Sequence, residues 1–132
     1  LYTLQLFAGI ANPTDGQTVY FGMQSVAGQT TAAVYVVPIP VAGTIIRADL
    51  EVGVGGTLGD AATATAYVRL NNTTDLTISA TVAFTAARQA YSAALSQAVS
   101  AGDYIQGKVI QPTWNTTNPT NLIYAIVVTI RT

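Results

Sequence analysis

The sequence predicts an all-β protein, an antiparallel β-sandwich of the jelly-roll type with about eight or nine strands in one domain over residues 1–132. Three observations predict this fold class. Three successive segments in the middle of the chain alternate apolar and polar residues with a period of two, as half-buried strands do. Turn-forming residues separate them at the spacing expected of a sandwich. Prolines mark two places where the chain can cross between sheets.

The N-terminal segment is expected to form a strand followed by a turn. Residues 2–8 alternate weakly between apolar and polar positions and end at Gly9. The polar cluster 12–16 follows, and its Asp15 and Gly16 suit a positive φ. We therefore expect a hairpin or an open loop at 12–16.

Two further strands are expected before the first proline-marked crossing. Residues 17–24 are rich in aromatic side chains, and residues 32–37 follow a break of small residues. Pro38 and Pro40 prevent regular pairing on either side of Ile39, because proline has no N–H to donate to a sheet. We expect a sheet edge or a crossing between sheets at this point.

The three central segments show the alternation most clearly, with apolar residues expected on the inward face of each. A glycine-rich loop at 53–59 joins the first two segments, and Asn71 with Asn72 supplies the turn between the last two. The expected inward residues are Ile46, Ala48, Leu50 and Val52 in the first, Ala64, Ala66, Val68 and Leu70 in the second, and Leu76, Ile78, Ala80, Val82 and Phe84 in the third.

Residues 85–98 leave two interpretations open. Ala87, Tyr91 and Leu95 recur at helical spacing, and the high alanine content favours a helix. Strong strands lie on both sides, however, and no capping residue marks the start of a helix. A strand with irregular flanks and a helical turn are both compatible with this segment.

The most informative stretch is 99–121. A strand is expected over 104–111, and Pro112 ends it because proline cannot donate to a sheet ladder. A long polar loop then carries the only tryptophan, Trp114. Residues 122–130 are apolar on both faces, which predicts a strand buried in the middle of the molecule. A second subunit is the simplest cover for its second face, although the chain's own loops would also serve.

Composition argues against several classes of function. The chain has no histidine and no cysteine, so Ser-His-Asp and Cys-His catalysis, disulfides and the usual zinc ligands are excluded. Only 8% of residues are charged and the net charge is -1, which argues against binding nucleic acid. The longest apolar run is far shorter than the ~20 residues of a membrane-spanning helix. The chain opens at Leu1, so we expect a processed or excerpted start.

The acidic residues stand singly beside turns or on a solvated strand face. A glycosidase pair is therefore not favoured, and calcium binding by Asp15, Asp60 or Asp103 is less favoured than the capping of turns. The loop at 53–59 lacks the spacing and the lysine of a phosphate-binding loop. We expect no enzymatic activity, no cofactor and no metal site.

Trp114 is the centre of the one candidate contact site, together with Tyr104, Asn115 and Asn118. Its ring could stack on a sugar while the amides bind hydroxyl groups. Alternatively, it packs against its own loop or against a neighbouring subunit.

Three blocks are informative together: IPVAGTIIRADLEVGVGGTLG at 39–59, YVRLNNTTDLTIS at 67–79 and VSAGDYIQGKVIQPTWNTTNPTN at 99–121. Their order and spacing resemble small jelly-roll proteins on the virions of tailed bacteriophages, found as capsid decoration proteins and as heads of tail fibres. The resemblance spans the last two thirds of the chain and includes no catalytic motif. It implies a non-enzymatic, trimeric component of the virion exterior with other virion proteins as partners.

Assembly is the primary functional hypothesis from the sequence. A surface of Thr, Ser, Asn, Gln and small apolar residues has few charges to desolvate, so it can be buried between copies at low cost and with little dependence on salt. The competing hypothesis is a carbohydrate-binding adhesin or receptor-binding tip that holds a host-surface glycan in the loops around Trp114. We expect a homo-oligomer, with a trimer favoured.

Overall fold

The computed structural model describes residues 1–27 and 35–132, and this part of the chain folds into β-strands and loops without a helix. Accordingly, it holds no helix that is long and apolar enough to cross a membrane. The strands are β1 (Tyr2–Ala11), β2 (Thr18–Phe21), β3 (Met23–Ala27), β4 (Val37–Pro38), β5 (Gly43–Gly55), β6 (Ala64–Leu70), β7 (Thr74–Val82), β8 (Arg88–Val99), β9 (Tyr104–Ile110) and β10 (Asn121–Arg131).

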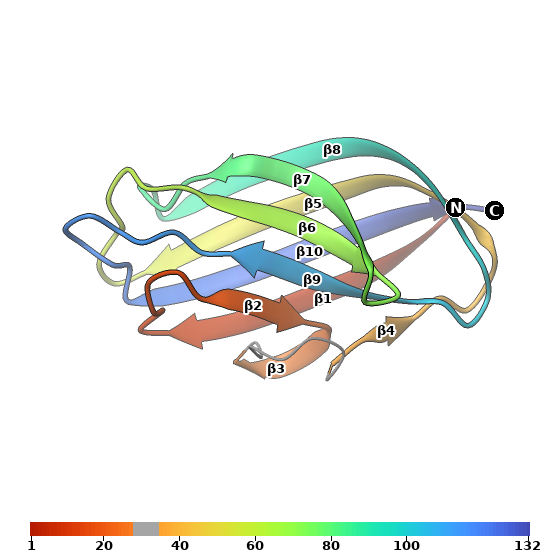
Figure 1. Ribbon diagram of the computed structural model, residues 1–132, viewed down its shortest axis with the longest axis horizontal. Helices are drawn as coiled ribbons and strands as arrows, with labels where there is room; N and C mark the ends of the chain where they lie inside the picture. Colours follow the sequence, from red (N-terminus) through yellow and green to blue (C-terminus); the bar gives the residue numbers. More distant parts are fainter. Residues whose placement is uncertain (28–34) are drawn as a thin grey trace.

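The strands form two packed sheets (Figure 1). Sheet A has the order β3-β1-β10-β5-β8, and sheet B has the order β2-β9-β6-β7, with β4 also paired to β9. The chain changes sheet after every strand except β6, because β6 and β7 form a hairpin within sheet B. This connectivity is that of a jelly roll, so the predicted fold class is confirmed. Among the described strands, the β1–β3 pair alone is parallel.

The core lies between the two sheets. The inward side chains of β10 are Leu122, Tyr124, Ile126, Val128 and Ile130, and each of them is buried. The predicted inward residues of β6 are also buried, which confirms the alternation expected for that segment. The central position of β10 in sheet A, between β1 and β5, agrees with the prediction from its apolar sequence.

A β-bulge corrects the predicted face of β5. Thr129 pairs with Arg47 and Ile130 pairs with Ile45, so Ile46 is an extra residue without a partner on β10. Ile45 is therefore inward and buried, whereas Ile46 is only half-buried. The prediction for Ile46 was wrong because a bulge reverses the alternation on one side of it. The rest of the predicted inward set on β5 is buried as expected.

A second bulge corrects β7. Ala66 pairs with Ser79 and Ala64 pairs with Val82, so β7 has one more residue than β6 between these two positions. Ala80 consequently is exposed instead of inward. Leu76 is half-buried because it lies toward the open side of the sandwich, where β7 is the last strand of sheet B.

The ambiguous segment is a strand. β8 runs from Arg88 to Val99 and pairs with β5 over most of its length. Sheet pairing therefore outweighs the helical propensity of its alanines. β5 in turn continues to Gly55, so the predicted loop at 53–59 begins later than expected, at Gly56 with φ +73°.

The predicted turns are present. Asn71 and Asn72 have positive φ angles of 51° and 58° in the β6–β7 hairpin. At 12–16 the positive φ angles belong to Asn12 and Gly16.

The predicted strand 17–24 is divided into β2 and β3. Residues 32–34 of the predicted strand 32–37 lie outside the described residues, and Val37 and Pro38 pair with β9 as a short edge strand.

Candidate functional site

The four residues predicted as one contact site do not come together. Tyr104 begins β9, whereas Trp114, Asn115 and Asn118 lie in the loop that follows the other end of this strand. Seven residues of strand at about 3.3 Å each separate the two groups by roughly 20 Å or more. Tyr104 therefore cannot share a ligand-binding site with the other three residues.

Trp114 belongs to the core. Its side chain is 3% exposed, and its ring meets the ring of Phe84 edge-on at a centroid distance of 5.3 Å. Gly59 lies so close that an added Cβ would stand 3.1 Å from the indole Nε1 of Trp114. The ring is not available to stack on a sugar, so the structure shows the packing alternative. Burial of an aromatic ring is a property of the folded chain that its place in a polar loop did not reveal.

Asp60 organises the loop that carries Trp114. Its carboxylate accepts hydrogen bonds from the backbone N–H groups of Thr116 at 2.7 Å, Thr117 at 3.2 Å and Ala62 at 3.0 Å. These bonds stabilise the ionised form and lower the pKa of Asp60 from 3.8 to about 2. Asp60 is thus a capping residue for two loops at this end of the sandwich.

Asp15 fixes the same loop from its other side. It accepts hydrogen bonds from the Trp114 N–H at 3.2 Å and from the Asn118 side-chain amide at 2.9 Å. The Asn118 amide also donates to the carbonyl of Pro13. At the opposite end of the molecule, Asp103 accepts from the N–H of Ser100. All three predicted capping carboxylates therefore cap backbone or loop groups.

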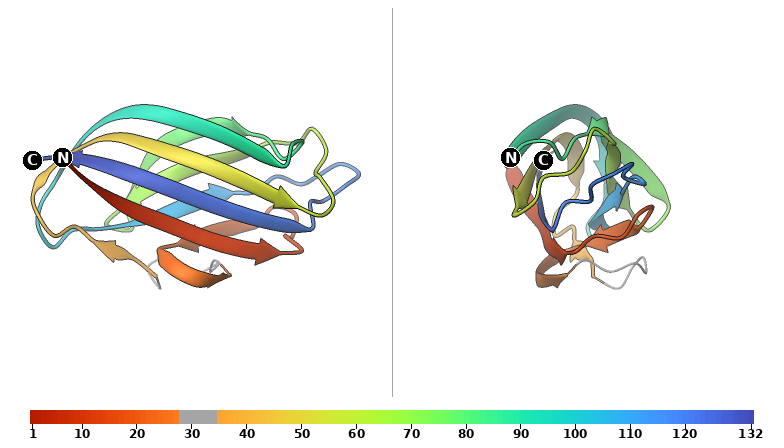
Figure 2. Two further views of the ribbon diagram at one scale, coloured as in Figure 1. Left: turned by 180° about the vertical axis from the view of Figure 1, so that it is seen from behind. Right: turned by 90° about the vertical axis from the view of Figure 1, so that its left-hand side faces the viewer.

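The described residues contain no group of three or more acidic side chains that could hold a metal ion. A different feature remains as the candidate site: the outer face of sheet A, where β1, β10, β5 and β8 lie side by side (Figure 2). The outward positions of these strands include Thr3, Gln5, Phe7, Gly9, Ile123, Ala125, Val127, Thr129, Arg47, Asp49, Glu51, Gly53, Arg88, Ala90, Ser92 and Ala94.

One half of the outer face is apolar. Ile123 is 54% exposed and Phe7 is 38% exposed. Phe7 pairs with Ala125 across β1 and β10, and Ile123 lies between two glycines, Gly9 on β1 and Gly53 on β5. Because glycine has no side chain, neither neighbour covers Ile123. The second apolar face of β10, which the sequence predicted to be buried, is open in the single chain.

The other half of the outer face is charged but internally neutralised. Arg47 lies 2.8 Å from the Asp49 carboxylate. Arg88 pairs with Glu51. Hydrogen bonds from Arg47 and Ser92 lower the pKa of Asp49, and the bond from Arg88 lowers the pKa of Glu51. Arg47, Asp49, Glu51 and Arg88 therefore each already have an opposite charge beside them.

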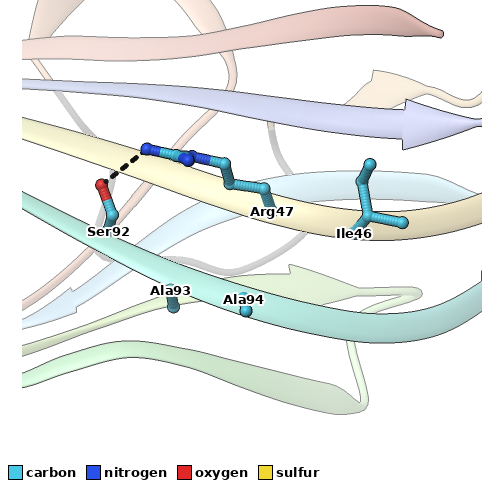
Figure 3. Close-up of a pocket in the computed structure, with 5 residues that line it drawn as sticks. All are labelled: Ile46, Arg47, Ser92, Ala93 and Ala94. Carbon is cyan, nitrogen blue, oxygen red and sulfur yellow. Dashed lines mark hydrogen bonds between the residues drawn. The ribbon is translucent and has the colours of Figure 1, made fainter.

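Two shallow hollows lie over β5 and β8 in this charged half. Ile46, Arg47, Ser92, Ala93 and Ala94 line one of them, and Figure 3 shows Arg47 reaching along the sheet to Ser92. The second hollow adjoins it and reaches Val127 on β10. Both form because β8 presents small alanine and serine side chains beside the longer side chains of β5. Apolar side chains and the paired residues Arg47, Asp49 and Glu51 line the two hollows.

Sequence reasoning missed a second cluster, on the outer face of sheet B. Lys108 and Arg69 both pair with Asp75, at 2.6 and 2.7 Å. The Lys108 ammonium also lies 5.3 Å from the ring centre of Tyr67 and 6.0 Å from that of Tyr20. These side chains come from β2, β6, β7 and β9, so strand pairing alone brings them together. The Lys108 side chain is only 13% exposed, and the cluster stabilises the packing of the four strands against one another.

Comparison with known proteins adds information on the fold. No family model matches this sequence, and no curated protein matches it significantly. Among solved structures, the fold is similar to that in the crystal structure of murine APRIL, with a TM-score of 0.45 and 12% sequence identity. The match covers 97% of this chain and 100% of the other. At this level the likeness carries no argument about family or function.

Proposed function

We propose that this protein is a non-enzymatic structural protein whose copies pack together on the exterior of a phage virion, as a capsid decoration protein or the head of a tail fibre. One observation carries the proposal: the outer face of sheet A leaves Ile123 and Phe7 exposed beside half-buried Ala125 and Val127. The place on a virion is supported by the sequence resemblance of the blocks at 39–59, 67–79 and 99–121.

The exposed apolar side chains of this face favour burial by another protein surface. Covering exposed apolar area contributes roughly 25 cal/mol per Å². The usual opposing term is the desolvation of charges, which is costly when a charge loses water without gaining a partner. Here Arg47, Asp49, Glu51 and Arg88 are paired before any contact forms. A partner can therefore cover these four residues without supplying matching charges.

The glycan-binding alternative has less support. Trp114, the ring proposed to stack on a sugar, is in the core, and the Asn118 amide is engaged with Asp15 and Pro13. Binding to a glycan array by a protein that does not assemble would favour this alternative.

The mass of the purified protein in solution tests the proposal. Sedimentation velocity at micromolar concentration should show a homo-oligomer, with a trimer expected, whose mass changes little between about 0.1 and about 1 M salt. Ile123→Lys should lower the mass to that of one chain. Ile110→Lys is the matched control because Ile110 is exposed to 39% but lies on the outer face of sheet B; it should leave the oligomer intact.

The location is tested on particles. Antibody labelling of phage particles that carry this gene product should mark the capsid or tail exterior, and Ile123→Lys should reduce the labelling while Ile110→Lys does not. A wild-type protein that stays monomeric at about 100 μM, or that binds a glycan array without assembling, would contradict the proposal.

A further inference from the structure

We infer that the outer face of sheet A receives the β7–β8 edge of a second copy of this chain, so that each copy offers a face to one neighbour and an edge to the next. The inference rests on the proposed function, because it names the partner and the contact through which the copies assemble.

The β7–β8 edge is the open side of the sandwich. In the described part of the chain, sheet A ends with β8 and sheet B ends with β7, so each of these strands has a hydrogen-bonded neighbour strand on one side alone. Figure 1 shows the two strands together along one margin of the molecule. The inward-facing Tyr91, Ala93 and Leu95 of β8 are only half-buried, as is Leu76 of β7. In the strands at the centre of either sheet, by contrast, inward residues are fully buried.

β8 is also an unusually unprotected edge strand. It is 12 residues long and carries a single charge, Arg88, at its first position. It contains no proline. Edge strands of soluble proteins are normally shortened, charged or interrupted, because a long uncharged edge pairs with other chains. An edge of this kind is explained if another part of the assembly covers it.

The face and the edge are chemically complementary. The edge brings apolar and small side chains, and its two charged residues are paired within the subunit: Arg88 of β8 with Glu51, and Asp75 of β7 with Arg69 and Lys108. The face offers the apolar Ile123 and Phe7, and its two ion pairs, Arg47–Asp49 and Arg88–Glu51, lie within the subunit. A second copy of this chain thus supplies a surface with the composition that the face requires.

The size of the face matches a specific interface. Four strands spaced about 4.8 Å apart, with about eight residues each at about 3.3 Å, cover a flat area of roughly 500 Å². The accessible surface of side chains exceeds the flat area, so this face comes near the roughly 800 Å² that each partner buries in a standard protein–protein interface. A smaller fragment would leave part of the apolar half exposed.

The two surfaces differ, and this determines the symmetry. An interface between a face and an edge is heterologous: each copy has both halves, and successive copies close into a ring when the rotation permits. An interface of two faces, or of two β8 edges, is isologous and gives a dimer. The inference therefore predicts head-to-tail assembly, which closes into a ring in the expected trimer, and excludes a two-fold dimer as the basic unit.

Mixing two interface variants tests the inference. Ile123→Lys damages the face and keeps the edge, whereas Leu95→Lys damages the edge and keeps the face. Each variant alone should sediment as one chain. A mixture of both contains one intact face and one intact edge, so it should form a dimer of one copy of each, detected by native mass spectrometry of differently isotope-labelled chains.

Controls separate this outcome from misfolding. Leu95 is half-buried, so Ala80→Lys, at an exposed position of the same edge, is the second edge variant and should behave in the same way. Circular dichroism of each variant should retain the β signal of the wild type.

The results distinguish a failure of the face-to-edge contact from a failure of the proposed function. If the wild type is oligomeric but the edge variants remain oligomeric, or the mixture stays monomeric, the face-to-edge contact is wrong while the proposed function stands. If the wild type is itself monomeric, the proposed function fails.

Discussion

A methyl group added at Gly107 should destabilise the protein, because the space beside this residue is filled by a core ring. Gly107 lies in β9, where it pairs with Phe21 of β2 and Val68 of β6. A Cβ at Gly107 would stand 2.8 Å from Cδ2 of Phe21 and closer still to Cε2 and Cζ. The Phe21 ring is fully buried and stacks on Tyr124 at 5.9 Å, and Tyr124 is held by a 2.8 Å hydrogen bond to Gln111. The ring therefore has no free space into which it can move.

The magnitude follows from two opposing terms. Overpacking a closed core costs about 1–3 kcal/mol. Replacing glycine by alanine within a strand contributes about 0.5–1 kcal/mol in the opposite direction, because it restricts the unfolded chain. Gly107→Ala should therefore lower the free energy of unfolding by the difference between these terms, about 0–2.5 kcal/mol and about 1 kcal/mol at the middle of both ranges. Gly55→Ala is the matched control, since its Cβ would meet only the Cβ of Asn121 at an ordinary 3.6 Å; it should be neutral or slightly stabilising.

Unfolding in guanidinium, followed by the fluorescence of the single, buried Trp114, measures the free energy of unfolding of both variants. All samples are compared at one protein concentration, because assembly adds to apparent stability. The double variant Gly107→Ala with Phe21→Leu removes the atoms that clash, so its loss of stability should be smaller than the sum of the single losses by at least about 1 kcal/mol. Equal stability of Gly107→Ala and Gly55→Ala, or strict additivity in the double variant, would refute the reasoning.

Two further predictions concern the loop end of the sandwich. Because the pKa of Asp60 is lowered from 3.8 to about 2, its ionised form stabilises the fold above pH 4, and this contribution is lost as the pH falls toward 2. Asp60→Asn should therefore reduce stability at neutral pH and flatten the acid limb of a curve of stability against pH. Parallel curves for the two proteins would contradict the capping role. Trp114→Ala should cost about 3–5 kcal/mol because it removes a buried ring from contact with Phe84, and Trp114→Phe should cost less; full stability of Trp114→Ala in thermal unfolding would show that the ring is not part of the core.

Strand positions and turns were predictable where they depend on neighbours in the chain. The inward set of β6 follows from a period of two, and the turn at Asn71 and Asn72 follows from the tolerance of asparagine for positive φ. The bulges at Ile46 and Ala80 were not predictable, because each depends on the residue count of a partner strand.

The candidate site was predictable in part. The apolar character of both faces of β10 is visible in residues 122–130, and it led to the expectation of a second cover. The glycines that leave Ile123 uncovered, Gly9 and Gly53, come from strands remote in sequence, so their role emerges from pairing. The charge pair between Glu51 and Arg88 likewise requires β5 and β8 to be adjacent.

The sequence alone determined that the chain folds as a two-layer β protein with few ionised groups, because residue alternation, turn chemistry and composition are local properties that need no knowledge of distant contacts. The tertiary structure decided which surfaces remain open. Trp114 is enclosed and Ile123 is exposed, although one lies in a polar loop and the other in an apolar strand. Burial depends on which distant segments lie opposite a side chain, and packing of the whole chain is what brings those segments there.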